Sequence, residues 1–271
     1  MKRIVFKVGT ATLYENNKLI SSRIDEIVKL LSELNEKYEI LLVSSGAVGA
    51  GYTKCKLDKT TLENKQALAA IGQPLLMREY KERFNKYGIT VAQVLLTAAD
   101  FDSRKRTKNA QKMINVLLKN KIIPIINEND SVSVEEIIFG DNDQLSAYVT
   151  YYFDADLLII LSDIDAFYTD NPKINKNAKP IKIVKEIKEE WLKQDCNPNN
   201  EFATGGIVTK LKAAKFLMER NKKMFLTSGF NLDDVKEFLK GNHKGGTLFI
   251  KENNESSSDK QKSLSWLWDF R

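Results

Sequence analysis

The sequence predicts an α/β fold in which a mainly parallel sheet carries helices on both faces. Short apolar runs alternate along the chain with segments of helical periodicity, which is the pattern of strands joined by crossover helices. The run at 39–43 is apolar on both faces, as a parallel strand buried between two helical layers should be. With 271 residues, the chain can bury a substantial core. We expect strands at 3–8, 39–43, 90–96, 122–126, 157–161, 223–227 and 247–250.

The helices follow from the spacing of apolar side chains. In 22–38 apolar residues recur every three or four positions, with Ser22 placed to cap the first turn. Pro74 suits a first helical turn, so two separate helices are expected at 60–71 and 74–87. Further helices are expected at 104–119, from 140 onward, from 204–206 to 220 and at 232–240; residues 131–140 alternate like a hairpin or flap, and 169–200 read mainly as loops. We expect one domain over 1–250, followed by a polar linker and a short aromatic tail over 251–271.

Composition limits the possible classes of protein. The chain is 42% hydrophobic and 29% charged, as in ordinary globular proteins, and no stretch predicts a signal peptide or a membrane span. The net charge of +6 leaves an RNA-binding protein as an alternative, but 34 of the 42 basic residues are lysines spread along the chain rather than clustered arginines. Two distant cysteines, Cys55 and Cys196, predict free thiols and therefore a reducing, cytoplasmic location.

Polar and glycine-rich residues recur where the predicted strands end. They are Lys7 with Gly9, residues 44–51, residues 127–130, Ser162 with Asp163, and residues 204–210. Taken singly, such residues are usually turns or helix caps. Because the carboxyl ends of parallel strands meet at one edge of a sheet, we expect the five groups to converge on one site.

The chemistry of these groups is suited to anions. SSGAVGAG at 44–51 and TGGIVTK at 204–210 offer bare backbone amides at helix starts, and Lys7 on a central strand is costly to bury unless it meets an anion. Neither the Rossmann fingerprint nor the P-loop spacing is present. Asp141 and Asp143 flank Asn142, either as helix caps or as carboxylates that orient lysines or a Mg²⁺-bound nucleotide. Without a Ser, His or Cys triad, phosphoryl transfer is favoured over hydrolysis.

The order of these motifs resembles the amino acid kinase family over roughly residues 1–250. The resemblance is closest to members that phosphorylate the side-chain carboxylate of L-glutamate, on the motifs KVGT at 7–10, SSGAVGAG at 44–51, AAIGQ at 69–73, INEND at 126–130, GDND at 140–143, LSD at 161–163, TGG with Lys210, and GTLF at 246–249. It implies a three-layer α/β/α sandwich and transfer of the ATP γ-phosphate to L-glutamate, giving γ-glutamyl phosphate for proline biosynthesis. Many members carry a C-terminal PUA domain; this chain ends about twenty residues after GTLF, so the form without that domain is expected.

The resemblance also implies roles for individual residues. Lys7 and Lys210 would be catalytic lysines on the phosphoryl group, with Asp143 organising them. The substrate-binding residues would be Ser45, Gly46, Asn127, Asp130 and Asn142. The nucleotide would lie against Lys7, Ser162, Asp163, Thr204, Gly205, Gly206, Ile207, Val208, Thr209 and Lys210, with Mg²⁺ bound mainly through its phosphates.

Three alternatives compete with this interpretation. The nearest is N-acetylglutamate kinase, against which Asp130 speaks because a carboxylate suits a free α-ammonium better than an acetamide. The second is a catalytically silent nucleotide-binding regulator, and the third is the RNA-binding protein suggested by charge. For the favoured interpretation, the partners are L-glutamate and ATP, and a homo-oligomer is expected, without nucleic acid or membrane.

Overall fold

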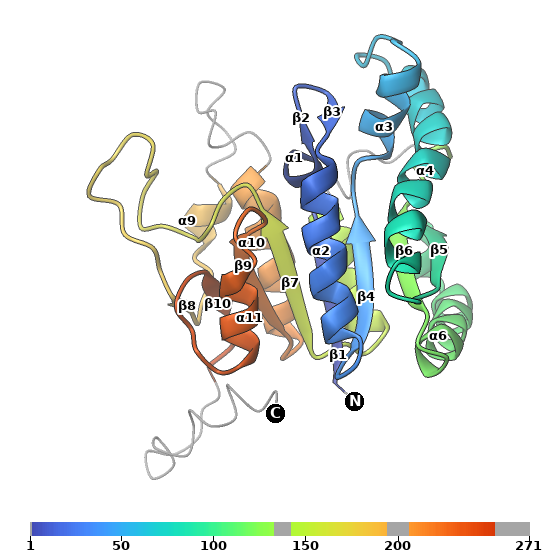
Figure 1. Ribbon diagram of the computed structural model, residues 1–271. Coiled ribbons are helices and arrows are strands. Elements are labelled where there is room, and N and C mark those ends of the chain that lie inside the picture. Colours follow the sequence, from blue (N-terminus) through green and yellow to red (C-terminus); the bar gives the residue numbers. More distant parts are fainter. Residues whose placement is uncertain (1, 133–141, 194–205, 253–271) are drawn as a thin grey trace.

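The computed structural model describes residues 2–132, 142–193 and 206–252, and its central feature is one eight-stranded sheet (Figure 1). The strands follow the order β5-β6-β4-β1-β7-β9-β10-β8, and the first six are parallel to one another, so the predicted mainly parallel α/β fold is confirmed. Only the pairing of β10 with β9 is antiparallel in this sheet, as far as the described residues go. The strands are β1 (Arg3–Val8), β4 (Glu39–Ser44), β5 (Val91–Leu96), β6 (Ile123–Glu128), β7 (Leu157–Ser162), β8 (Ile183–Val184), β9 (Lys223–Ser228) and β10 (Thr247–Phe249).

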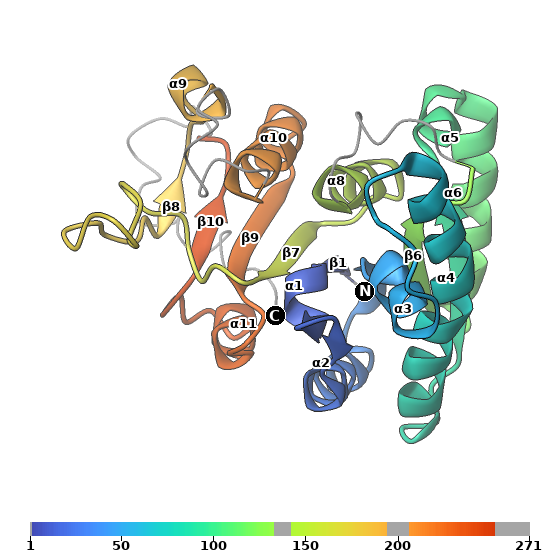
Figure 2. The same cartoon turned by 90° about the horizontal axis from the view of Figure 1, so that it is seen from above.

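Helices cover both faces of the sheet and give the three layers (Figure 2). One face packs against α2 (Ser21–Leu34), α4 (Leu62–Asn85) and α11 (Asp233–Leu239). The other packs against α6 (Arg104–Lys119), α8 (Asn142–Tyr152) and α10 (Gly206–Glu219). Shorter helices are α1 (Thr10–Leu13), α3 (Ala47–Lys54), α5 (Ala98–Asp102) and α9 (Glu189–Leu192). None of the helices in the described ranges is long and apolar enough to cross a lipid bilayer.

The prediction of a helix break at Pro74 is wrong, because α4 runs through it without interruption. A proline inside a helix costs about 3 kcal/mol. Packing on both sides of Pro74 opposes that cost. Before it, Gly72 lies so close to α3 that a Cβ atom there would be 1.8 Å from the Ala47 carbonyl oxygen. After it, Tyr80 and Phe84 are fully buried in the core. Similarly, α2 begins at Ser21, and Ser22 does not cap it.

A small hairpin, β2 (Tyr14–Glu15) and β3 (Lys18–Leu19), lies between α1 and α2 and was not predicted. Its turn residues Asn16 and Asn17 have φ of 50° and 58°. Two consecutive left-handed residues are the mark of a type I′ turn, and asparagine adopts that conformation more readily than most residues. The sequence therefore did carry a local signal for this hairpin.

The first strand lies in the middle of the sheet, between β4 and β7. The chain turns to one side of β1 to form β4, β6 and β5, and to the other side to form β7 and β9. Such a switch point opens a crevice at the carboxyl ends of the strands, which is where parallel α/β proteins bind ligands. The expected hairpin at 131–140 and the tail at 251–271 fall largely outside the described residues, and the domain division stays a prediction.

Candidate active site

Two lysines and one aspartate form a buried charge cluster at the carboxyl end of β1. Lys7 Nζ lies 2.7 Å from Asp143 Oδ1, and Lys210 Nζ lies 3.1 Å from Asp143 Oδ2. The exposed fractions are 2% for Lys7, 4% for Lys210 and 0% for Asp143. Side chains from opposite ends of the sequence thus meet around one carboxylate, which is the arrangement expected for Lys7, Lys210 and Asp143.

The three side chains come from three elements that the fold brings together. In β1, side chains alternate between the faces, so Lys7 points with Val5 toward the layer of α8 and α10. Asp143 lies in the first turn of α8, and Lys210 lies one turn into α10. Thr209 Oγ1 also donates to Asp143 Oδ2 at 2.9 Å, while Lys210 Nζ donates to the Gly206 carbonyl oxygen at 2.8 Å.

The electrostatics of the cluster keep the aspartate ionised. Burial by itself raises the pKa of Asp143, but the ammonium groups of Lys7 and Lys210 outweigh burial and hold that pKa well below its usual range. One buried carboxylate between two buried ammonium groups leaves a formal charge of +1. A group of this charge is suited to a phosphoryl group, whose oxygens are negatively charged.

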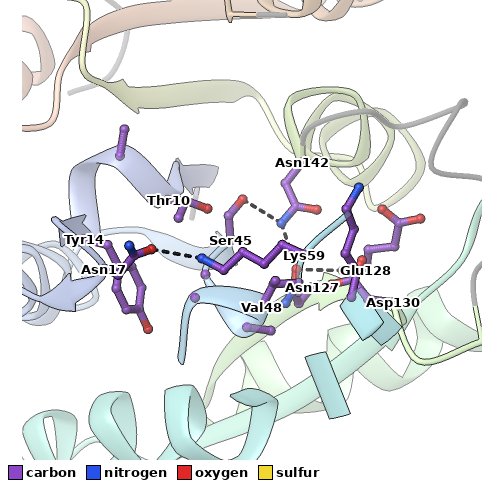
Figure 3. Close-up of a pocket in the computed structure, with 15 residues that line it drawn as sticks. Thr10, Tyr14, Asn17, Ser45, Val48, Lys59, Asn127, Glu128, Asp130 and Asn142 are labelled. Atoms are coloured by element: carbon purple, nitrogen blue, oxygen red, sulfur yellow. Dashed lines mark hydrogen bonds between the residues drawn. The ribbon is translucent and has the colours of Figure 1, made fainter. Parts of the chain in front are cut away.

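Next to this cluster lies a cavity of about 660 Å³ (Figure 3). A chain of neutral side chains forms its inner wall. Asn142 Nδ2 donates to Ser45 Oγ at 2.9 Å and to Asn127 Oδ1 at 2.8 Å. Asn127 Nδ2 in turn donates to Gln73 Oε1 at 2.9 Å. The wall therefore holds Ser45, Asn127 and Asn142 in fixed orientations beside the charge cluster.

The turn after β4 shapes another part of the cavity. Gly46 has φ of 112°, a left-handed value that favours glycine, and it caps the N-terminus of α3. A Cβ atom on Gly46 would lie 2.9 Å from the Tyr14 ring. The turn places residues 45–49 along the cavity. Together with residues from other elements, all five predicted substrate residues therefore line the cavity: Ser45, Gly46, Asn127, Asp130 and Asn142.

Apart from Lys7, the described residues that were predicted to bind a nucleotide lie on the β7 and α10 side of the cluster. Ser162 is buried at the end of β7 and donates to the exposed Asp163 carboxylate at 3.0 Å. Ile207 and Val208 are buried in the core, so these two could contact a nucleotide only through their backbone. Gly206, Thr209 and Lys210 lie in the first turns of α10. Thr204 and Gly205 lie outside the described residues, and so does Asp141 of the predicted carboxylate pair.

Several cavity residues were not predicted. They include Tyr14 and Asn17 of the hairpin and Glu128 at the end of β6. Lys59, between α3 and α4, and Lys65, in the first turn of α4, also line the cavity. Glu128 belongs to the group 127–130 that was expected at the site, but no role was predicted for it. Lys59 and Lys65 carried no signal, because nothing local distinguishes them from the many surface lysines of this chain.

Comparison with known proteins gives a consistent picture. Residues 2–228 match the sequence model of the amino acid kinase family. A glutamate 5-kinase from Leishmania donovani is 54% identical over 92% of this chain and 95% of its own length, and one from Wolinella succinogenes is 52% identical over 92% and 98%.

Solved structures support the fold at much lower identity. An isopentenyl phosphate kinase in a substrate complex superposes with a TM-score of 0.63 at 15% identity, covering 92% of this chain and 99% of the other. A UMP kinase from Bacillus anthracis gives 0.64 at 15% identity, covering 93% and 97%. The chain therefore belongs to the amino acid kinase family, and the two relatives named above are glutamate 5-kinases.

Proposed function

We propose that this kinase transfers the γ-phosphoryl group of ATP to the side-chain carboxylate of L-glutamate, giving γ-glutamyl phosphate, the first step of proline biosynthesis. The observation that carries the proposal is the buried Lys7–Asp143–Lys210 cluster beside a polar cavity, in a chain about half identical to glutamate 5-kinases. A cytoplasmic enzyme that forms homo-oligomers is expected.

The lysines stabilise the charge of the transferred group. As the phosphoryl group leaves ADP, negative charge spreads over its equatorial oxygens, and two ammonium groups in a water-poor site interact with it strongly. Asp143 acts as a positioning residue, because its two oxygens hold Lys7 and Lys210 on opposite sides. No part of the cluster has to move a proton.

The acceptor needs no general base. A glutamate side-chain carboxylate has an ordinary pKa near 4.3, so it is already ionised and nucleophilic at pH 7. The enzyme has to hold two anions close together. The neutral side chains of the cavity wall are suited to this, because Asn142 donates to Ser45 and is followed directly by Asp143 of the charge cluster in α8. Asp130, at the cavity wall, would bind the α-ammonium of the amino acid.

The nucleotide would lie over the β7 and α10 ends, with its phosphates toward Lys7, Lys210 and the first amides of α10. Within the described ranges, no three acidic, histidine or cysteine side chains gather into a metal-binding cluster. A Mg²⁺ ion is expected to be bound mainly through the nucleotide phosphates, where it would neutralise their charge during transfer.

A substrate screen tests the proposal. Purified protein with Mg-ATP is given L-glutamate, N-acetylglutamate, aspartate, carbamate or UMP; ADP release is followed, and hydroxylamine traps any acyl phosphate as a hydroxamate. We expect ADP and hydroxamate with L-glutamate only. Preference for N-acetylglutamate would favour N-acetylglutamate kinase, and no turnover with any acceptor, despite nucleotide binding, would favour a silent regulator.

A further inference from the structure

Lys59 extends along the wall of the cavity from the segment between α3 and α4 (Figure 3). Its Nζ donates to Asn17 Oδ1 at 2.9 Å, across to the turn of the β2–β3 hairpin. The same ammonium lies 3.8 Å over the centre of the Tyr52 ring. Two contacts from different elements thus hold one half-buried lysine at the cavity.

Neither contact neutralises its charge. Asn17 offers a neutral amide oxygen, and the ring offers only its quadrupole. Among the residues that the structure describes, no carboxylate forms an ion pair with Lys59, whereas Lys7 and Lys210 both face Asp143. An ammonium has three N–H donors, so Lys59 keeps donor capacity for a ligand in the cavity.

We propose that Lys59 binds the α-carboxylate of the amino-acid substrate and is the residue by which the cavity selects acceptors that carry this group. This rests on the proposed function. An α-amino acid presents an ammonium and a carboxylate on one carbon, and the cavity wall offers the complementary pair, Asp130 and Lys59. The side-chain carboxylate is then left for Ser45, Asn142 and the charge cluster.

The restraints on Lys59 strengthen such a contact. A free lysine side chain loses rotamer entropy when it becomes immobilised on binding. Asn17 and Tyr52 already limit the positions of the ammonium, so less is lost when a ligand binds. A charge-assisted hydrogen bond held in this way distinguishes a carboxylate from a neutral amide of the same shape.

The test compares L-glutamate with isoglutamine, in which a neutral amide replaces the α-carboxylate while the α-ammonium and the side-chain carboxylate remain. The wild type should have a glutamate KM about 10-fold to 100-fold below the Ki of isoglutamine. Loss of a hydrogen bond between two charged groups weakens binding by about this factor. In Lys59→Met the glutamate KM should rise by that factor, isoglutamine Ki should hardly change, and kcat should be retained. Lys59→Arg should keep part of the preference.

Lys56→Met is the matched control, because Lys56 also lies over the Tyr52 ring, at 4.1 Å, but is not among the residues that line the cavity. It should leave both constants unchanged, and the melting temperatures of all variants show that each is folded. Equal losses for glutamate and isoglutamine in Lys59→Met would overturn the proposal in favour of a purely structural Lys59–Asn17 contact. A loss of preference in Lys65→Met but not Lys59→Met would overturn it in favour of Lys65. If wild type releases no ADP with glutamate, it is the proposed function that fails.

Discussion

The two walls of the active site differ in how they hold their side chains. One wall, where we propose that the phosphoryl group binds, contains Lys7, Asp143 and Lys210, which are charged and almost fully buried; we call it the phosphate wall. The other, where we propose that the amino acid binds, contains the neutral amide chain of Gln73, Asn127 and Asn142; we call it the acceptor wall. A buried charge that loses its partner costs several kcal/mol, whereas a neutral hydrogen bond is worth about 1 kcal/mol. We therefore expect any single substitution in the phosphate wall to cause a large loss of activity or stability. Single substitutions in the neutral chain of the acceptor wall should cause small losses.

The largest effect should come from removing a lysine. Lys7→Ala and Lys210→Ala should each lower kcat about 10²-fold or more with a modest change in glutamate KM, because the charge is most needed as transfer proceeds. Lys215→Ala is a control on the same helix as Lys210, where Lys215 pairs with Glu189 on the surface. A turnover near that of the wild type for either lysine variant would show that the cluster does not take part in phosphoryl transfer.

Next comes Asp143→Asn, which should both slow kcat and lower the free energy of unfolding by about 3–5 kcal/mol, because two buried ammonium groups lose their counter-charge. Unfolding by urea measures the second effect. A helix cap alone would cost only about 1 kcal/mol and leave kcat intact, so the two roles are distinguishable.

The same residue predicts a pH dependence. The pKa of Asp143 is lower in the folded protein than the value near 3.9 of an unfolded aspartate, so on acidification the unfolded state takes up the proton first. The stabilisation is present above about pH 4 and is lost as pH falls below that value. Melting temperatures between pH 7 and pH 3 should therefore fall more steeply for wild type than for Asp143→Asn. Parallel curves would contradict a depressed pKa.

A smaller effect is expected from Asp130→Asn on the acceptor wall. If Asp130 binds the α-ammonium, glutamate KM should rise about 10-fold to 150-fold while ATP KM stays constant. Discrimination against N-acetylglutamate should weaken as well, since an acceptor without an ammonium would no longer lie next to a carboxylate. A larger change in ATP KM would place the amino-acid site elsewhere.

The smallest effect tests the neutral chain itself. Gln73→Ala removes the acceptor of the Asn127 amide and should cost about 1–2 kcal/mol of unfolding free energy. Glutamate KM should rise only a few-fold, with kcat unchanged. A loss as large as that of the lysine variants would show that the two walls do not differ as described.

Much of this architecture could be predicted from local patterns. The sequence predicted Lys7 on a central strand, and β1 does lie between β4 and β7. The polar strand ends predicted the edge of the sheet at which Ser45 and Asn127 line the cavity. What local patterns could not give depends on contacts between distant segments. Continuity of α4 through Pro74 is set by packing on α3 and the core, and the pairing of Lys59 with Asn17 joins segments 42 positions apart.

The glycine contact between α3 and α4 has a consequence for substrate range. At Gly51 and Gly72 the two helices touch backbone to backbone, and a Cβ atom on either would lie 2.0 Å or less from a carbonyl oxygen of the other helix. Side-chain size at this crossing therefore cannot serve to widen or narrow the neighbouring cavity in small steps. Engineering of a longer or bulkier acceptor would have to start in the hairpin and in the segment that carries Lys59, where atoms can be exchanged without separating two helices.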